Sequence, residues 1–372
     1  MTIQSSSSPS QIEAHQSQSS GRRRISRRKL LIFGGGGVVA LGLGGFLNWQ
    51  YTHSPRYIQH MDGEVIAVAW SPDSHQFVAL NTTGMMTVWT VDGQQVYSQS
   101  TLESENNTLS SLIAWSPNGK YLASGGSGVH IWNARNGKLL SSFPTFAGTV
   151  VAWSPDNKRI AVGGDYGKIQ IRDPESGRIQ LTLQAYKNAD GEVYLNSLAW
   201  SPDGSHIAAL GPHQGDFLAC WNTITGEATL LPFKEPVDEP NFINSIAWSP
   251  DGQHIAAAYH NYDKGIVALW SRQEQGGRWR YDGSVAAHFW LVYEISWSPD
   301  STHFATVGQD NKIQVWNISS KTLSNTSTTS DPDTNDGRGI DFYALQALGW
   351  SPDGKYLLAG DSAGQIWLWT IS

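Results

Sequence analysis

The stretch "SIAWSPDGQHIAAAY", residues 245–259, decides the fold of this chain. It predicts a short apolar strand that ends at Trp248, a tight turn over Ser-Pro-Asp-Gly, and a second apolar strand. In such a turn proline presets φ at the second position, aspartate is favoured at the third, and glycine suits the last.

The same phrase recurs seven times along the chain with small changes. Each copy has a tryptophan followed by Ser-Pro and then Asp or Asn, and the copies stand 38 to 53 residues apart. The tryptophans are Trp70, Trp115, Trp153, Trp200, Trp248, Trp297 and Trp350. A repeat period in this range indicates one supersecondary unit stacked many times.

A second phrase follows each turn at a nearly constant interval, as in "VWN" around Trp316. Its central residues are Trp89, Trp132, Arg172, Trp221, Trp270, Trp316 and Trp369. After most of these comes another turn signal and then a further short apolar run, such as residues 179–183. Each unit is therefore predicted to hold four short strands joined by hairpin turns.

These two phrases make residues 55–372 resemble the WD-repeat (tryptophan–aspartate) family of β-propellers. The resemblance implies an all-β, seven-bladed propeller whose four-stranded antiparallel blades surround a central channel. A spare strand at residues 56–59 is predicted to become the outer strand of the last blade and to close the ring. The propeller of the bacterial Tol system shares the Trp-Ser-Pro-Asp-Gly phrase, but the small polar residue after most third-strand tryptophans favours the WD resemblance.

The first 54 residues have a different composition. Residues 1–29 begin rich in Ser and Gln, which predicts a disordered tail, and end with six cations between Arg22 and Lys29. Residues 30–47 carry no charge and could form a membrane-spanning helix of about 27 Å, and residues 48–54 form a short linker. The stretch around Arg27 and Arg28 resembles a bacterial twin-arginine export signal.

The apolar segment lacks a following Ala-x-Ala cleavage site, which favours an uncleaved single-pass anchor. The cations before it predict a cytoplasmic tail and a propeller on the extracytoplasmic side of a bacterial plasma membrane. An ordinary Sec-inserted signal-anchor would give the same orientation and stays an alternative. A cytosolic chain is disfavoured, because the segment has no amphipathic face.

The charge of the propeller argues against two classes of partner. Of the 25 Lys and Arg and 32 Asp and Glu in the chain, six cations and one acid fall within the first 49 residues, which leaves 19 cations against 31 acids. An acidic propeller is a poor candidate for binding nucleic acid or an anionic membrane surface. Cys220 is the single cysteine, so no intramolecular disulfide exists.

The chain contains no His-Glu-x-x-His motif, no phosphate loop and no Cys-x-x-Cys pair. The sixth unit contains His288, Thr306, Asp310 and Trp316, of which the first three superficially suggest a nucleophile triad. The WD resemblance instead implies a structural hydrogen-bonded tetrad. The acidic stretch 331–342 departs from the spacing of a calcium loop and is predicted to be a solvated insertion. We expect no catalytic residue, no cofactor and no metal.

In WD repeats the loops between blades share one narrow face, the top face, with the turns between second and third strands, and loops on a rigid scaffold concentrate binding residues. Aromatic residues and amides stand there together, as in many interface hot spots. The candidate partner-binding residues are Tyr194, Asn196, Phe242, Asn244, Trp290, Tyr293, Gln309 and Gln346. For Tyr194 and Phe242, sealing the contact between blades is an equal alternative.

The resemblance and these residues predict a monomeric, membrane-anchored scaffold without catalytic activity that binds a protein or peptide at its top face. Two alternatives stay open: recognition of glycans or other small ligands, and a hydrolase- or lyase-type enzyme that uses the central channel. Glu64 is the one acid four to six residues before a first-strand tryptophan, which argues against the channel enzyme.

Overall fold

The computed structural model describes residues 55–101, 112–126, 128–145, 150–164, 167–184, 195–210, 218–234, 243–273, 277–328 and 344–371. The predicted export signal at Arg27 and Arg28 and the predicted helix over residues 30–47 lie outside these ranges. Within these ranges, no helix has both the length and the apolar character needed to cross a membrane.

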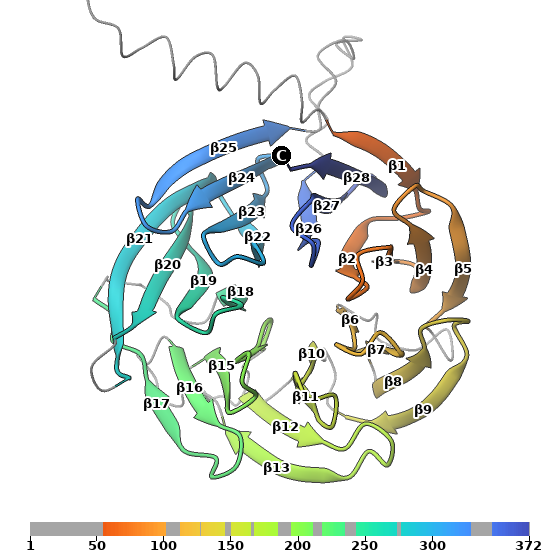
Figure 1. The fold of residues 1–372 in the computed structure, drawn as a ribbon, viewed down its shortest axis with the longest axis horizontal. Coiled ribbons are helices and arrows are strands. Elements are labelled where there is room, and N and C mark those ends of the chain that lie inside the picture. Colours follow the sequence, from red (N-terminus) through yellow and green to blue (C-terminus); the bar gives the residue numbers. More distant parts are fainter. Residues whose placement is uncertain are drawn as a thin grey trace, which may run out of the picture. The chain divides into compact units, whose positions relative to one another are not determined.

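Residues 45–372 form one compact unit that contains seven four-stranded antiparallel sheets. Figure 1 shows these sheets as blades arranged in a ring, with first strands such as β2, β18 and β26 innermost. The seven-bladed propeller predicted from the repeats is therefore confirmed.

Blades 1 to 3 follow one another along the chain. Blade 1 consists of β2 (Val65–Trp70), β3 (Gln76–Asn81), β4 (Met85–Thr90) and β5 (Gln95–Ser100). Blade 2 consists of β6 (Ile113–Trp115), β7 (Tyr121–Ser124), β8 (Gly128–Asn133) and β9 (Leu139–Pro144). Blade 3 consists of β10 (Val150–Trp153), β11 (Ile160–Gly163), β12 (Lys168–Arg172) and β13 (Ile179–Gln184).

Blades 4 to 7 complete the ring. Blade 4 consists of β14 (Ala199–Trp200), β15 (His206–Leu210), β16 (Leu218–Asn222) and β17 (Ala228–Leu230). Blade 5 consists of β18 (Ile243–Trp248), β19 (His254–Asn261), β20 (Lys264–Arg272) and β21 (Trp279–Phe289). Blade 6 consists of β22 (Val292–Trp297), β23 (His303–Gly308), β24 (Lys312–Asn317) and β25 (Thr322–Thr328). Blade 7 consists of β26 (Leu345–Trp350), β27 (Tyr356–Asp361), β28 (Gln365–Thr370) and β1 (Arg56–His60).

The ring closes through β1, which pairs antiparallel with β28. Arg56 lies opposite Leu368, and His60 lies opposite Gln365. This pairing confirms the predicted closing strand. It also covers the edge of β28, which would otherwise present unpaired backbone groups.

The repeated turn owes its sequence to hydrogen bonds within the turn. In blade 5 the Ser249 hydroxyl donates to Asp251 Oδ1 over 2.5 Å and accepts from the His254 N–H over 2.9 Å. Gly252 has φ +70°, in the left-handed region that favours glycine. Because Ser249 is fully buried and Asp251 holds the turn together, strand, turn and strand form as one local unit.

The core lies between neighbouring blades. The second and third strands of each blade are buried on both faces, and this explains why β19 reads as the continuous apolar run Ile255–Tyr259. The outer strand β5 contains only exposed and half-buried residues, because one of its faces meets solvent.

Candidate functional site

The inner strands of blades 1, 5, 6 and 7 each contain a β-bulge, which changes the direction in which their side chains point. In each of these strands the pairing register shifts between the residues five and three before the tryptophan, for example between Val292 and Glu294 in β22. The bulged residues are Ile66, Asn244, Tyr293 and Gln346. A bulge interrupts the usual alternation of faces, so two successive side chains can turn toward the channel.

The channel mouth is a cavity of about 220 Å³ at the starts of the inner strands. It is lined by Ile66, Leu112, Val150, Leu195, Asn196, Ser197, Asn244, Ser245, Tyr293, Glu294 and Gln346. The structure thus brings together Asn196, Asn244, Tyr293 and Gln346, four of the predicted partner-binding residues, from four blades.

The wall of the channel has a polar half and an apolar half. In blades 4 and 5 the residue three before the tryptophan is Ser197 or Ser245, and each hydroxyl accepts from a backbone N–H of the next blade, over 2.9 and 3.1 Å. In blade 6 the same position is Glu294, whose Oε2 accepts from the Leu348 N–H over 2.6 Å. The remaining blades carry Ala67, Leu112, Val150 and Ala347 there. At this position Ser197, Ser245 and Glu294 therefore each accept a hydrogen bond from the next blade. The apolar side chains of the other four blades cannot form such a bond.

Glu294 was missed by the sequence reasoning, which considered only acids four to six residues before the tryptophan. The Glu294 side chain is half-buried: it keeps some contact with solvent at the channel, but protein atoms surround most of it. Burial raises the pKa of Glu294 to about 8, against the opposing effect of the hydrogen bond from the Leu348 N–H. Glu294 fills the same inter-blade role as Ser197 and Ser245, so a structural role accounts for it.

The amides at the channel mouth are partly engaged already. Gln346 donates to Glu64 Oε2 over 3.0 Å, and Asn244 donates to the Val292 carbonyl over 3.1 Å. Burial raises the pKa of Tyr293, and the negative charge of Glu64 adds to this rise. These contacts place Glu64 at the rim beside Gln346 and Tyr293.

A second group of exposed residues lies in the Trp290 loop, residues 289–291, which comprises the last residue of β21 and the two residues before β22. The side chains of Phe289 and Trp290 are 59% and 49% exposed, and their rings meet edge to face at 5.6 Å. Trp290 has φ +67°, which is rare for a bulky residue. Its N–H donates to the Asp263 carbonyl over 2.9 Å, in the hairpin turn that also exposes Tyr262.

Two glycines make room for this loop. A Cβ added at Gly265 would lie 2.5 Å from the Trp290 carbonyl oxygen. A Cβ added at Gly308 would lie 2.6 Å from both His288 Cγ and the Leu291 carbonyl oxygen. Because atoms cannot approach so closely, both positions need glycine for the loop to lie where it does.

The predicted tetrad joins His288 of blade 5 to Thr306, Asp310 and Trp316 of blade 6, and it supports the same loop. His288 contacts Asp310 Oδ1 through Nδ1 at 2.7 Å and Thr306 Oγ1 through Nε2 at 2.8 Å, and Trp316 Nε1 donates to Thr306 Oγ1 over 3.3 Å. Burial tends to raise the pKa of Asp310, but hydrogen bonds and charges, led by those of His288, outweigh it and lower the pKa. The Phe289 N–H also donates to Asp310 Oδ2, over 3.4 Å.

The remaining predicted residues separate into two groups. Gln309 is exposed and lies apart from the channel mouth, and its N–H donates to the Leu291 carbonyl over 3.1 Å, at the end of the Trp290 loop. Tyr194 and Phe242 lie outside the described residues, as does the whole of the predicted acidic insertion at residues 331–342. Within the described part of the chain, no group of three His, Cys, Asp or Glu side chains could hold a metal ion.

Sequence comparison agrees with this geometry. The family described as "WD domain, G-beta repeat" matches residues 235–271, 280–317 and 341–370. The chain carries WD40 repeats. A second family, "Eukaryotic translation initiation factor eIF2A", matches residues 47–171, a segment that includes blades 1 and 2 and the first strands of blade 3.

Three curated proteins are similar to parts of this WD40-repeat chain. Mouse WD repeat-containing protein 1 is 28% identical over 205 residues, 54% of this chain and 30% of its own length. Polyadenylation factor subunit 2 of Candida albicans is 23% identical over 133 residues, 33% of this chain and 20% of its own length. Protein HIRA of Dictyostelium discoideum is 29% identical over 87 residues, 22% of this chain and 8% of its own length. The similar region spans less than a third of each relative.

Proposed function

We propose that this chain is a non-catalytic scaffold that holds a protein or peptide partner at the face formed by the channel mouth and the Trp290 loop. The observation that carries the proposal is Trp290 itself, a half-exposed indole on a backbone held by hydrogen bonds and by two glycines. An aromatic anchor that is already fixed loses little freedom on binding, and such anchors supply most of the energy of many interfaces.

The surroundings of Trp290 suit a polypeptide ligand. Phe289 and Tyr262 add exposed aromatic surface, and the amides of the channel mouth offer both donors and acceptors. The Candida relative is named as a subunit of a polyadenylation factor, and we carry over from it only a role within an assembly.

The test compares exposed apolar side chains at opposite ends of the blades. The double variant Phe289→Ala, Trp290→Ala removes the anchors, and Ile224→Ala, in the turn between β16 and β17, removes an even more exposed apolar side chain far from them. Partners would be captured from detergent-solubilised native membranes, identified, and their affinities measured by calorimetry. We expect binding to weaken at least about tenfold in the double variant and to stay unchanged in Ile224→Ala. Equal binding by all three proteins would refute the proposal.

We further propose that residues 30–47 tether the propeller to a bacterial plasma membrane with the propeller outside the cytoplasm. The support is the uncharged segment after six cations and the twin-arginine-like stretch. Protease added to spheroplasts should degrade the propeller, and an Arg27→Lys, Arg28→Lys variant should remain protected inside the cell. Export of that variant would favour the Sec route, and protection of the unmodified chain would refute the outside location.

A further inference from the structure

Contacts between neighbouring blades follow one pattern at four of the seven interfaces. The side chain six residues after the tryptophan of one blade lies on the tryptophan of the next blade. The pairs are Tyr356 on Trp70 at 6.0 Å, Tyr121 on Trp153 at 6.0 Å, Arg159 on Trp200 at 4.9 Å and His254 on Trp297 at 5.9 Å. In the same four interfaces the indole N–H donates over 3.0 to 3.3 Å to a backbone carbonyl of the preceding blade. These four tryptophans are only 7–8% exposed.

The tryptophans of blades 2, 5 and 7 depart from this pattern. Trp115, Trp248 and Trp350 are half-buried. Among the described contacts, none of these rings stacks on a side chain of the preceding blade, and none of their indole N–H groups donates to a carbonyl of that blade. Trp350 donates to the Gly354 carbonyl of its own turn over 3.3 Å instead. The indole nitrogens of Trp115 and Trp248 are buried with no hydrogen-bond partner in the described part of the chain.

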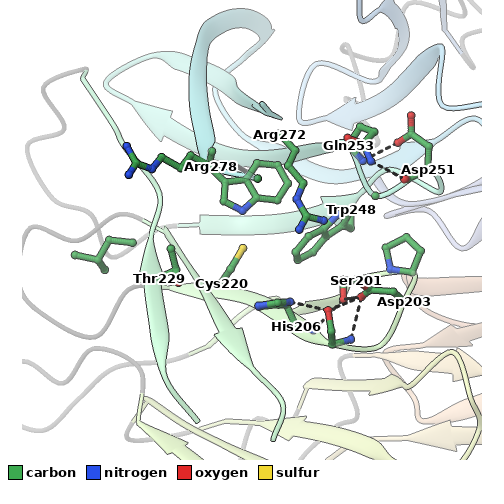
Figure 2. Close-up of a pocket in the computed structure, with 16 residues that line it drawn as sticks. Ser201, Asp203, His206, Cys220, Thr229, Trp248, Asp251, Gln253, Arg272 and Arg278 are labelled. Carbon is green, nitrogen blue, oxygen red and sulfur yellow. Dashed lines mark hydrogen bonds between the residues drawn. The ribbon is translucent and has the colours of Figure 1, made fainter. Parts of the chain in front are cut away.

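Between blades 4 and 5 the displaced indole borders a pocket of about 690 Å³. Trp248 packs edge to face on Trp279 of its own blade, with ring centres 5.5 Å apart, instead of lying against His206 of blade 4. Figure 2 shows His206 and Cys220 on one side of this pocket and Trp248 and Arg272 on the other. The pocket lies at the turn end of the blades, opposite to the Trp290 loop.

Comparison among the repeats singles out Arg272. Two residues after the third-strand position, the other blades carry Val91, Ala134, Pro174, Thr223, Ile318 and Ile371. Every one of these residues except Pro174 has the same backbone role: the Arg272 N–H donates to the Gln253 carbonyl over 2.8 Å, just as the Val91 N–H donates to the His75 carbonyl over 3.0 Å. The fold therefore does not require arginine at this position, and the exposed guanidinium is available to the pocket.

Arg278 is the second cation that lines the pocket. Neither its side chain nor that of Arg272 forms an ion pair or hydrogen bond within the described residues. The two acids of the pocket are engaged by their own turns: Asp203 accepts from the Ser201 hydroxyl over 2.6 Å, and Asp251 accepts from the Ser249 hydroxyl over 2.5 Å. The uncommitted charged groups of the pocket are thus the two guanidinium groups, which suit an oxyanion.

The other polar groups of the pocket favour binding over catalysis. Burial raises the pKa of Cys220 to about 12, although the charge of Arg272 opposes this, so the thiol stays protonated. Burial lowers the pKa of His206 against the charge of Asp203, and the charge of Arg272 lowers it further. A neutral imidazole and an inert thiol can line a ligand, but they supply no thiolate nucleophile.

We propose that this pocket binds a small organic anion whose phosphate or carboxylate group contacts Arg272 and Arg278 and whose flat ring lies against Trp248 and Trp279. The volume is within the range of small-molecule sites. An indole face can pack on a ring, and a guanidinium can bind an oxyanion through two parallel hydrogen bonds. This site lies apart from the scaffold face, so either proposal can fail without the other.

The test uses the full chain in detergent and calorimetric titration with four probes: AMP, indole-3-acetate, adenosine and inorganic phosphate. AMP and indole-3-acetate supply an anion on a ring from two chemical sources, adenosine supplies the ring alone, and phosphate supplies the anion alone. The variant is Arg272→Val, Arg278→Ala, in which the valine copies Val91 of blade 1. The matched control is Arg280→Ala, which removes an exposed cation outside the pocket.

We expect AMP, indole-3-acetate or both to bind at least about tenfold more tightly than adenosine and phosphate, and the double variant to lose at least about tenfold in affinity. Arg280→Ala should bind within about twofold of the unmodified chain. The absence of binding by both ring anions at about 5 mM would overturn the proposal. Undiminished binding by the double variant, with its fold verified by circular dichroism, would overturn it as well. Equal binding of adenosine would exclude the anion site, and equal binding of phosphate would exclude the ring site.

Discussion

Replacing Glu294 by glutamine should remove a loss of stability that the protein suffers as the pH rises. Glu294 holds its proton in the folded state up to a pKa of about 8, whereas its ordinary value is 4.5. Between these two values the folded protein binds a proton at this carboxyl that the unfolded chain has released. Stability from this group is therefore complete below pH 4.5, falls as the pH rises toward 8, and is constant above that.

The magnitude follows from the width of this window. Each pH unit within it lowers the free energy of unfolding by about 1.4 kcal/mol, which gives an upper limit of about 5 kcal/mol over the whole interval. Because the side chain retains some contact with solvent at the channel, we expect a smaller effect, about 2–3 kcal/mol at pH 8. Glutamine keeps an oxygen that can accept from the Leu348 N–H and never ionises, so it should be neutral near pH 5 and stabilising at pH 8.

The assay is urea unfolding, followed by tryptophan fluorescence, of the unmodified chain and of Glu294→Gln at each pH unit from 5 to 8. The lowered pKa of His206 acts in the opposite direction, because its stabilising effect is lost as the pH falls below its ordinary value. It contributes equally to both proteins, so the difference between the two curves isolates Glu294. A difference that stays constant from pH 5 to pH 8 would refute the reasoning.

Three other substitutions or reactions test the packing. Gly308→Ala should destabilise the protein by about 1–3 kcal/mol and displace Trp290, which thermal unfolding and partner binding would detect; unchanged stability would show that the loop can relax. Cys220 should react with a disulfide reagent at neutral pH only as fast as the protein unfolds, and rapid labelling of native protein would contradict its burial. His206→Tyr, which copies the stacked residues of blades 2 and 7, should draw Trp248 back into the interface and raise the unfolding temperature; a crystal structure with the indole unmoved would contradict this.

Local hydrogen bonding explains why the fold could be predicted from the sequence. The Ser-Pro-Asp-Gly phrase forms its turn with its own side chains, as Ser249 and Asp251 show, so each copy marks a hairpin wherever it stands. Once seven hairpins were identified at a nearly constant period, the spare strand at residues 56–59 had one edge left to pair with, and it pairs with β28.

The channel mouth could be predicted only in part, because a bulge changes the direction of side chains without changing the residue pattern. The amides Asn196, Asn244 and Gln346 were found from their constant distance to the tryptophan. Glu294 was not found, since strict alternation places it on the opposite face from Tyr293. A comparison of every inner-strand position across the seven repeats would have revealed it, because its counterparts are small or apolar residues.

A comparison of equivalent positions reveals Arg272 but does not predict the pocket that it lines between blades 4 and 5. His206 and His254 are the same residue at the same place in successive repeats, and both precede a blade that begins with the same tryptophan. Yet His254 stacks on Trp297 at 5.9 Å, whereas Trp248 packs on Trp279 instead of His206. The competing contact comes from an outer strand 31 residues after Trp248, in the same blade. The repeat sequence thus determines the position of each tryptophan in its strand. Packing decides whether the indole lies on the preceding blade or on its own outer strand. Trp248 packs on its own outer strand, and this leaves the pocket open.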